Sequence, residues 1–243
     1  MKNSKDYSEK IKKLYRSWKK NKSVDLTAAV YEEPLEALVA ALISERYPDA
    51  EARRIYKRAQ SHFTDLNDLR VSRAEEIIEV LGDHSQSAQT ISQNLTRILN
   101  QVFDRYDTMS LISLKAMGKR QGRKEIEALD GISRFAVDYC FLTALGGHAV
   151  PLTESMRALL VREELIHPEA TEEEVHGFLE RQIPAAEAWA FYTLLRAAGE
   201  GILSTASVSQ PAAKPSRKPA VKKPAARKAA VKTKTARKSL PKK

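Results

Sequence analysis

Two groups of residues in this 243-residue sequence have types and spacing that suit a binding or metal site. The first is the segment Glu127–Ala136, in which Gly131 lies between two helix-forming stretches. A tight turn there can point backbone N–H groups outward beside a helix N-terminus, which suits a phosphate oxygen. A single glycine between two helices is also typical of an ordinary corner. The residues alone leave both interpretations open.

The second group is Glu173-x-x-His176, which has the spacing of two metal ligands on one helix face. A di-metal carboxylate site needs this motif twice, with further carboxylates on other helices. We therefore expect a charged, solvated helix face and no metal or other cofactor. Cys140 is the only cysteine, which excludes a disulfide within the chain and a four-cysteine zinc or iron–sulfur site. It lies in an apolar stretch and is expected to be a small core residue.

Charge is distributed unevenly along the chain, whose net charge is +10. Residues 211–243 contain ten Lys, three Arg and no acidic residue, and residues 1–23 contain nine basic and two acidic residues. Residues 24–210 contain 19 basic and 29 acidic residues. An acidic body between two basic flanks is repelled by nucleic acid unless the flanks bind it.

The C-terminal flank is a low-complexity segment of Lys, Arg, Ala and Pro, for which we expect an extended, disordered chain. Its charges can release counterions from DNA and add salt-sensitive affinity that is independent of sequence. The expected contacts are Lys214, Arg217, Lys218, Lys222, Lys223, Arg227, Lys228, Lys232, Lys234, Arg237 and Lys238. A solubility or targeting tail, including a nuclear-import patch, is the alternative. RNA is the alternative polyanion for the tail.

The elements that position these residues are predicted to be helices almost throughout, so the fold class is all-α. Pro34 fits the first turn of a helix with apolar residues at i, i+3, i+4 and i+7. Asp49 is predicted to cap the next helix, Ser72 to begin a capping box, and Gly82 to end the helix that follows. Further helices are expected over 86–104, 134–145, 153–165, 171–181 and 184–198.

We predict three parts: a basic N-terminal helix over 1–23, a helical domain over 24–203 and the basic tail over 204–243. Tyr15 and Trp18 in the first helix are expected to pack on the domain, with the lysines outward. Stacking on bases or binding to a membrane surface is the alternative for these aromatic residues. No apolar run is long enough to cross a bilayer, and the basic N-terminus lacks the apolar region of a secretory signal. We expect no membrane partner.

Two segments resemble a known family when they are taken in order. LDGISRFAVDYCFLTALGGHAVPLTESMRALL (129–160) looks like the helix-hairpin-helix segment of endonuclease III-like DNA glycosylases, and PLEALVAALISER (34–46) is similar to an earlier helix of that family. The resemblance covers roughly residues 30–200. It implies the helical fold of the helix-hairpin-helix (HhH-GPD) superfamily, which acts in base-excision repair. It also implies that Gly131, Ile132, Ser133 and Arg134 contact the DNA backbone.

The sequence departs from this family at both positions that carry its chemistry. The family lysine, which forms a Schiff base with the sugar, falls on Phe135, and the family aspartate falls on Thr153. Phenylalanine has no amine, and threonine cannot oppose a developing positive charge. Glu154 and Asp138 are the carboxylates that could substitute. For Asp138 we expect a position facing solvent or near a cap, with a buried carboxylate serving a pocket as the alternative.

Two further departures concern DNA contacts. Asp130 replaces the family's proline and brings a negative charge to the hairpin unless it caps the following helix. The residue that fills the gap left by a flipped base falls on Arg46, and arginine can also fill such a gap. The iron–sulfur cysteines of many members are missing.

We therefore expect a catalytically degenerate DNA-binding protein, a pseudoenzyme that binds double-stranded DNA with little sequence preference and also senses damaged or abasic DNA. An active monofunctional glycosylase, without lyase activity, is the second hypothesis. A helical interaction domain whose tail binds RNA or an acidic partner is the third. We expect an intracellular protein, in the cytoplasm or nucleoid of a bacterium or the nucleus of a eukaryote. The sequence gives no oligomeric state.

Overall fold

The computed structural model describes residues 4–21 and 23–203, and these residues form helices and connecting loops without a β-strand. Contacts divide the chain after Gln210, so all described residues lie in the first of two units. The helices are α1 (Ser4–Trp18), α2 (Pro34–Ser44), α3 (Asp49–His62), α4 (Leu66–Val71), α5 (Ala74–Leu81), α6 (Gln86–Tyr106), α7 (Ser113–Ala116), α8 (Lys119–Glu127), α9 (Arg134–Thr143), α10 (Glu154–Arg162), α11 (Glu172–Gln182) and α12 (Ala188–Gly199). The all-α prediction is confirmed for this part of the chain. The predicted tail lies outside it.

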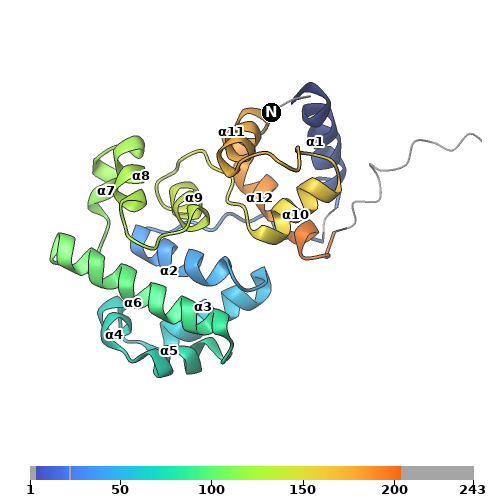
Figure 1. The fold of residues 1–243 in the computed structure, drawn as a ribbon. Coiled ribbons are helices and arrows are strands. Elements are labelled where there is room, and N and C mark those ends of the chain that lie inside the picture. The colour runs from blue at the N-terminus through green and yellow to red at the C-terminus, as the bar shows by residue number, and fades with distance from the viewer. Residues whose placement is uncertain (1–3, 22, 204–243) are drawn as a thin grey trace, which may run out of the picture. The chain divides into compact units, whose positions relative to one another are not determined.

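Helix α2 forms the centre of the described unit (Figure 1). Every residue of α2 except Glu36 is buried, and the helix packs against α3, α6 and α9. Pro34 occupies the first helical turn, as predicted. Glu33 caps the helix because its carboxylate accepts from Leu35 N at 3.1 Å, and the same carboxylate accepts from Leu111 N at 2.7 Å. The cap therefore also attaches the loop after α6 to the start of the central helix.

The remaining helices form two groups connected through α2 and α9 (Figure 1). In one group α3 packs on α5, and both α4 and α5 pack on α6. In the other, α12 packs on α10 and on α1, which also contacts α11. Helices α8 and α9 form a hairpin in which α9 packs on α2 and α7 packs on α8.

The basic N-terminal helix packs on this body as predicted. Ile11, Leu14, Tyr15 and Trp18 are all buried, while Lys12 and neighbouring basic residues are exposed. The Tyr15 ring meets the Phe191 ring edge to face at 5.3 Å between centroids. These aromatic residues therefore stabilise the junction of α1 with α12, and they are not available for stacking on bases.

The sequence predictions were wrong at three helix starts. Ser72 does not open a capping box, because its hydroxyl closes the preceding helix α4 by donating to Asp68 O at 2.8 Å. Asp49 is the first residue of α3, where it accepts from Arg53, and Pro48 occupies the cap position without a side-chain bond. The last helix begins at Ala188 after a short 3₁₀ turn, Ala185–Glu187. Gly82 does end α5, with φ of 70°.

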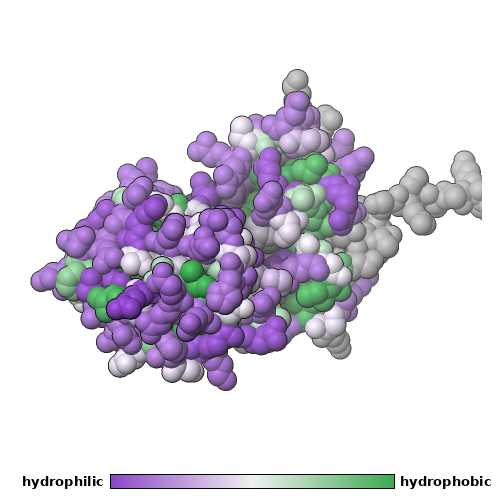
Figure 2. Space-filling model, turned by 60° about the horizontal axis from the view of Figure 1, so that its bottom comes forward, coloured by the Kyte–Doolittle hydropathy of each residue, from purple (hydrophilic) through white to green (hydrophobic). Residues whose placement is uncertain are grey.

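Among the described residues, no helix is long and apolar enough to span a bilayer. The face shown in Figure 2 is mainly hydrophilic, with small and separate hydrophobic patches. The large apolar side chains that are exposed are scattered: Val30, Val71, Ile112, Met117 and Ile202.

Candidate nucleic-acid interface

The turn between α8 and α9 has the shape that the glycine predicts. Gly131 adopts φ of 80°, a left-handed conformation that disfavours residues with a Cβ atom. A Cβ atom built on Gly131 would also lie 2.8 Å from Arg97 Nη1. The backbone of the turn thus favours glycine, and a larger residue would also displace the end of the Arg97 side chain.

Side chains of α6 hold the backbone of this turn. Gln101 Oε1 accepts from Asp130 N at 2.7 Å, and Gln101 Nε2 donates to Asp130 O at 2.9 Å. Arg105 donates to Ala128 O at 3.2 Å. Arg97 Nη1 lies 4.0 Å from Asp130 Oδ2. Contacts from α6 therefore stabilise the hairpin, and no pattern in the sequence indicated that Arg97 and Gln101 would reach it.

Ser133 is the N-cap of α9. Its hydroxyl accepts from Ala136 N at 3.1 Å and donates to Glu45 Oε2 at 2.7 Å. Glu45 immediately precedes Arg46, so one hydroxyl group connects the hairpin to the segment that carries the candidate gap-filling residue. Arg46 itself is exposed.

The charges around the hairpin are mixed. Asp130 does not cap α9, and its side chain is 85% exposed; the Glu45 carboxylate contacts the cap residue. Two carboxylates thus lie where a phosphate would approach. Two arginines are also nearby: Arg97, 4.0 Å from Asp130, is half-exposed, and Arg134, which pairs with Asp138, is partly exposed at the first position of α9.

 A basic hollow of about 570 Å³ lies at α8, the helix that precedes this turn, and its lining includes Lys119 and Lys124.

Phe135, at the position that the resemblance equates with the family lysine, is a core residue. It is 3% exposed, its ring stacks on Tyr139 at 5.9 Å between centroids, and it lies 6.4 Å from the Tyr192 ring. Tyr139 in turn contacts the ring of Trp189. Aromatic side chains therefore surround Phe135, and burying a ring of this size stabilises the fold by about 1.5–3 kcal/mol.

Thr153, at the position equated with the family aspartate, has a structural role as the N-cap of α10. Its Oγ1 accepts from Met156 N at 3.4 Å and shares a hydrogen bond with Ser155 Oγ at 3.0 Å. Glu154 is the first residue of α10 and is exposed. It is therefore an accessible carboxylate next to the substituted position.

Asp138 is fully buried, contrary to the expectation that it faces solvent or caps a helix. Its carboxylate lies 2.5 Å from Arg123 Nη2, 3.1 Å from Arg134 Nε and 2.9 Å from His176 Nδ1. Burial opposes its ionisation, but His176, Arg123 and Arg134 together lower the pKa of the carboxyl below its ordinary value. Three cationic or polar partners from α8, α9 and α11 thus enclose Asp138.

His176 is also buried, so the prediction of a solvated face for Glu173 and His176 is wrong for the histidine. Of the two residues, Glu173 is exposed, as predicted. The ring of His176 is 1% exposed and belongs to the Asp138 cluster. Within residues 4–21 and 23–203, no group of three or more His, Cys, Asp or Glu side chains could hold a metal ion. Cys140 is buried in the core, as predicted, and burial raises the pKa of its thiol.

The predicted contacts in the tail, Lys214 to Lys238, lie outside the described residues. The sequence interpretation also overlooked Arg196, whose contacts reach the segment of Arg46. The i,i+4 spacing of Arg196 and Glu200 was a signal for one of its contacts, because such a pair forms on one helix face. Nothing in the sequence indicated the contacts with α2.

No protein-family model and no curated protein sequence matches this chain. Solved structures do match it. A trapped endonuclease III–DNA covalent intermediate matches with a TM-score of 0.61 at 16% identity, over 81% of this chain and 86% of that one. A thermostable thymine-DNA glycosylase matches with a TM-score of 0.57 at 15% identity, over 82% of this chain and 87% of that one.

A third solved structure, a 3-methyladenine DNA glycosylase of H. pylori bound to 1,N6-ethenoadenine, matches with a TM-score of 0.59 at 14% identity. The match covers 82% of this chain and 99% of that one. At these identities the likeness shows a shared fold. The chain therefore has the fold of endonuclease III and other helix-hairpin-helix DNA glycosylases, as the resemblance predicted.

Proposed function

We propose that this protein binds double-stranded DNA with little sequence preference and no longer performs the glycosylase reaction of its scaffold. The observation that carries this proposal is the structural use of both substituted positions. Phe135 fills an aromatic core, and the Thr153 hydroxyl caps α10. Neither group can form a covalent bond to a sugar carbon or oppose a positive charge on the sugar.

The hairpin supports DNA binding by its geometry. Gly131 permits a turn that ends at the N-terminus of α9, and such a terminus attracts anions through its free N–H groups and helix dipole. Arg97 of α6 lies beside Asp130 of the turn, and Arg134 is the first residue of α9 after it. The carboxylates of Asp130 and Glu45 weaken this attraction, so the hairpin sets the position of the backbone and supplies little of the affinity.

The basic flanks supply most of the affinity in this proposal. The segment from Pro211 to Lys243 carries 13 positive charges and no negative charge. Its binding to phosphates would release counterions and depend steeply on salt, with a slope of about −0.9 per contact. The acidic residues of the body make this contribution necessary, because they repel DNA.

Damage sensing is assigned to Arg46. Its side chain is exposed on the segment that follows α2, and Ser133 connects that segment to the hairpin through Glu45. A guanidinium that enters a gap in the base stack can donate hydrogen bonds to the unpaired base. An abasic site offers this gap without the energy cost of flipping a base.

Two assays test the proposal together. Fluorescence anisotropy with a duplex at several salt concentrations should show binding whose salt dependence falls strongly when residues 205–243 are deleted. Incubation with duplexes that carry alkylated, deaminated or oxidised bases should give no alkali-revealed abasic sites. DNA affinity that does not change with salt would contradict the role of the tail.

Product formation would instead support an active monofunctional glycosylase. Glu154 is the carboxylate to test in that case, because it is exposed beside Thr153, whereas Asp138 is enclosed by its partners. Loss of product in Glu154→Gln would assign the reaction to this side chain.

A further inference from the structure

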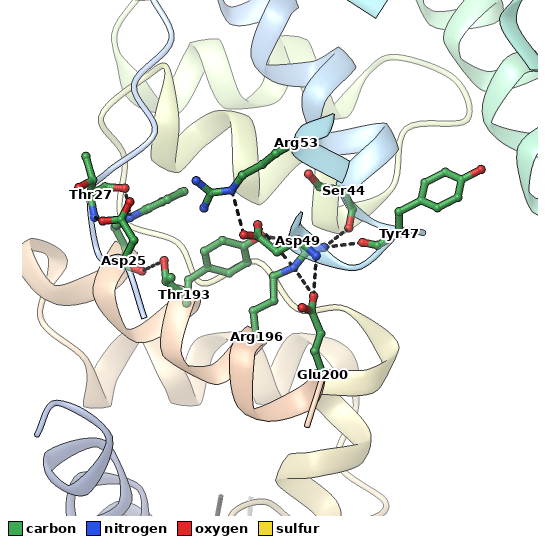
Figure 3. A network of polar contacts seen from close by, with 11 residues as sticks. Asp25, Thr27, Ser44, Tyr47, Asp49, Arg53, Thr193, Arg196 and Glu200 are labelled. Carbon is green, nitrogen blue, oxygen red and sulfur yellow. Dashed lines mark hydrogen bonds and ion pairs between the residues drawn. The ribbon is translucent and has the colours of Figure 1, made fainter. Parts of the chain in front are cut away.

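Arg196 of α12 is a buried arginine that contacts the backbone at Ser44 and at Tyr47 (Figure 3), the residues that flank the Glu45–Arg46 pair in the sequence. Its Nη2 donates to Ser44 O at 2.6 Å and to Tyr47 O at 2.7 Å. The side chain of Arg196 is 3% exposed. One guanidinium group thus bridges the last residue of α2 and the residue that follows Arg46.

Further contacts fix the direction of this guanidinium. Nη1 donates to the Tyr192 hydroxyl at 2.7 Å, and Nε donates to Glu200 Oε1 at 2.8 Å. Burial raises the pKa of Tyr192 to about 12, so the phenol stays neutral and accepts this bond. Glu200 Oε1 also accepts from Asp49 N at 2.9 Å, which attaches α12 to the start of α3.

The same segment has two more attachments. Glu45 accepts from Ser133 of the hairpin at 2.7 Å, and the Tyr47 hydroxyl donates to Asp83 Oδ2 at 3.0 Å. The Ser44–Tyr47 segment is therefore held at its backbone from α12, and at the side chains of Glu45 and Tyr47 from the hairpin and the loop after α5. Only Arg46 extends from this segment as an exposed side chain.

A rigid backbone lowers the entropy cost of inserting a side chain into DNA, because fewer conformations are lost on binding. A lysine in place of Arg196 could not keep all four of these bonds, because Nη1, Nη2 and Nε donate in different directions, whereas an ammonium has three donors on one nitrogen. The positive charge of Arg196 also suits the C-terminus of α2, whose last carbonyl groups carry partial negative charge.

We propose that Arg196 is a positioning residue for damage recognition: it holds the Ser44–Tyr47 segment so that Arg46 enters the gap at an abasic site. This inference rests on the proposed function of Arg46. Arg196 itself lies beneath the segment and touches no DNA.

The test compares Arg196→Lys with Arg157→Lys in the full-length protein. Arg157 is a matched control because its Nη2 also donates to a backbone carbonyl, Ala170 O at 2.7 Å, away from the Arg46 segment. Two quantities are measured: amide hydrogen exchange of residues 45–47 in the free protein, and the ratio of dissociation constants for an intact duplex and one with an abasic-site analogue.

Arg196→Lys should increase exchange of these amides by about tenfold or more. It should also reduce the preference for the abasic duplex by about tenfold, while affinity for the intact duplex and its salt slope stay the same. Arg157→Lys should change neither quantity. Should Arg196→Lys fail to fold, Glu200→Gln is the second variant, because it weakens the bond between Arg196 Nε and Glu200 Oε1. It should also reduce the preference for the abasic duplex.

An unchanged abasic preference in a folded Arg196 or Glu200 variant would overturn the inference. A wild-type protein without any preference would overturn the proposed function of Arg46, and with it the role of Arg196 in sensing. The exchange measurement separates these two failures, because it reports whether Arg196 holds the segment even when DNA recognition is absent.

Discussion

Ser133 and Glu45 are 88 residues apart in the sequence, and the Ser133 hydroxyl donates to Glu45 Oε2 at 2.7 Å. This bond joins the cap of α9 to the residue before Arg46. In the proposed function the hairpin contacts the DNA backbone and Arg46 enters the base stack, so the distance between them has to stay constant. The Ser133–Glu45 bond provides that constraint between the hairpin and the end of α2.

Replacing Ser133 with alanine should therefore affect both stability and damage recognition. Loss of the cap should lower the free energy of unfolding by about 1 kcal/mol, measured by urea denaturation. The abasic preference should also fall. Thr171→Ala is the matched control, because the Thr171 hydroxyl caps α11 by accepting from Glu174 N. Equal abasic preferences in the two variants would contradict the role of the Ser133–Glu45 bond.

Replacing Asp130 with asparagine should strengthen DNA binding severalfold at low salt. The exposed carboxylate lies at the hairpin turn, where it repels phosphate, and asparagine keeps the backbone bonds to Gln101. Glu173→Gln changes the net charge equally on the exposed surface of α11 and serves as the control. If both substitutions raise the affinity to the same extent in anisotropy titrations, the hairpin does not face the DNA.

Introducing lysine at Phe135 should destabilise the protein and should not restore strand cleavage. The ring fills an aromatic core, and truncation of such a residue alone costs about 3–5 kcal/mol. Position 153 would still hold a threonine, so the carboxylate that the family uses there would still be missing. Thermal unfolding and borohydride trapping of a covalent DNA adduct measure the two effects, with Phe135→Leu as a milder packing control. A trapped adduct in Phe135→Lys would show that the chemistry needs only the amine.

Asp138→Asn should lower stability at neutral pH because it leaves Arg123, Arg134 and His176 without their shared anion. Breaking a buried ion pair costs on the order of 3–5 kcal/mol. The folded-state pKa of Asp138 is lowered, so its contribution is fully present above the ordinary value of about 3.9 and is lost as the pH falls through the lower, folded-state value. Urea unfolding at pH 7 and at successively lower pH should show the two proteins converging in acid. A constant difference at all pH values would contradict this ionised cluster.

The sequence predicted those elements whose signals are local. Pro34 correctly marked the start of α2 and Gly82 the end of α5, because the backbone preference of a single residue decides each of these boundaries. The apolar spacing after Pro34 correctly indicated that α2 is a helix. Short helices such as α4 (Leu66–Val71) carry too few apolar positions to show a period. The capping box predicted at Ser72 was wrong because a serine side chain can either cap the following helix or bond to the end of the preceding one. The structure shows that the Ser72 hydroxyl donates to the carbonyl of Asp68 in α4.

The candidate site was less predictable because its contacts are long-range. Asp138 was expected near solvent, but its partners come from three helices, and no spacing in the sequence brings Arg123 and His176 together. Arg196 is 149 residues from Tyr47, whose carbonyl it holds. The resemblance located Phe135 and Thr153, and the structure then gave each of them a role in packing or capping.

The most direct test of the whole account is the affinity of a variant that lacks residues 205–243 for two duplexes that differ only in one abasic-site analogue. Removing the tail is necessary because its charge would mask a modest preference. The account predicts a preference of about tenfold or more for the abasic duplex, equivalent to about 1.4 kcal/mol, without any strand cleavage. Equal affinity for the two duplexes would contradict damage sensing by Arg46 and leave the scaffold as a platform for DNA binding by its basic flanks.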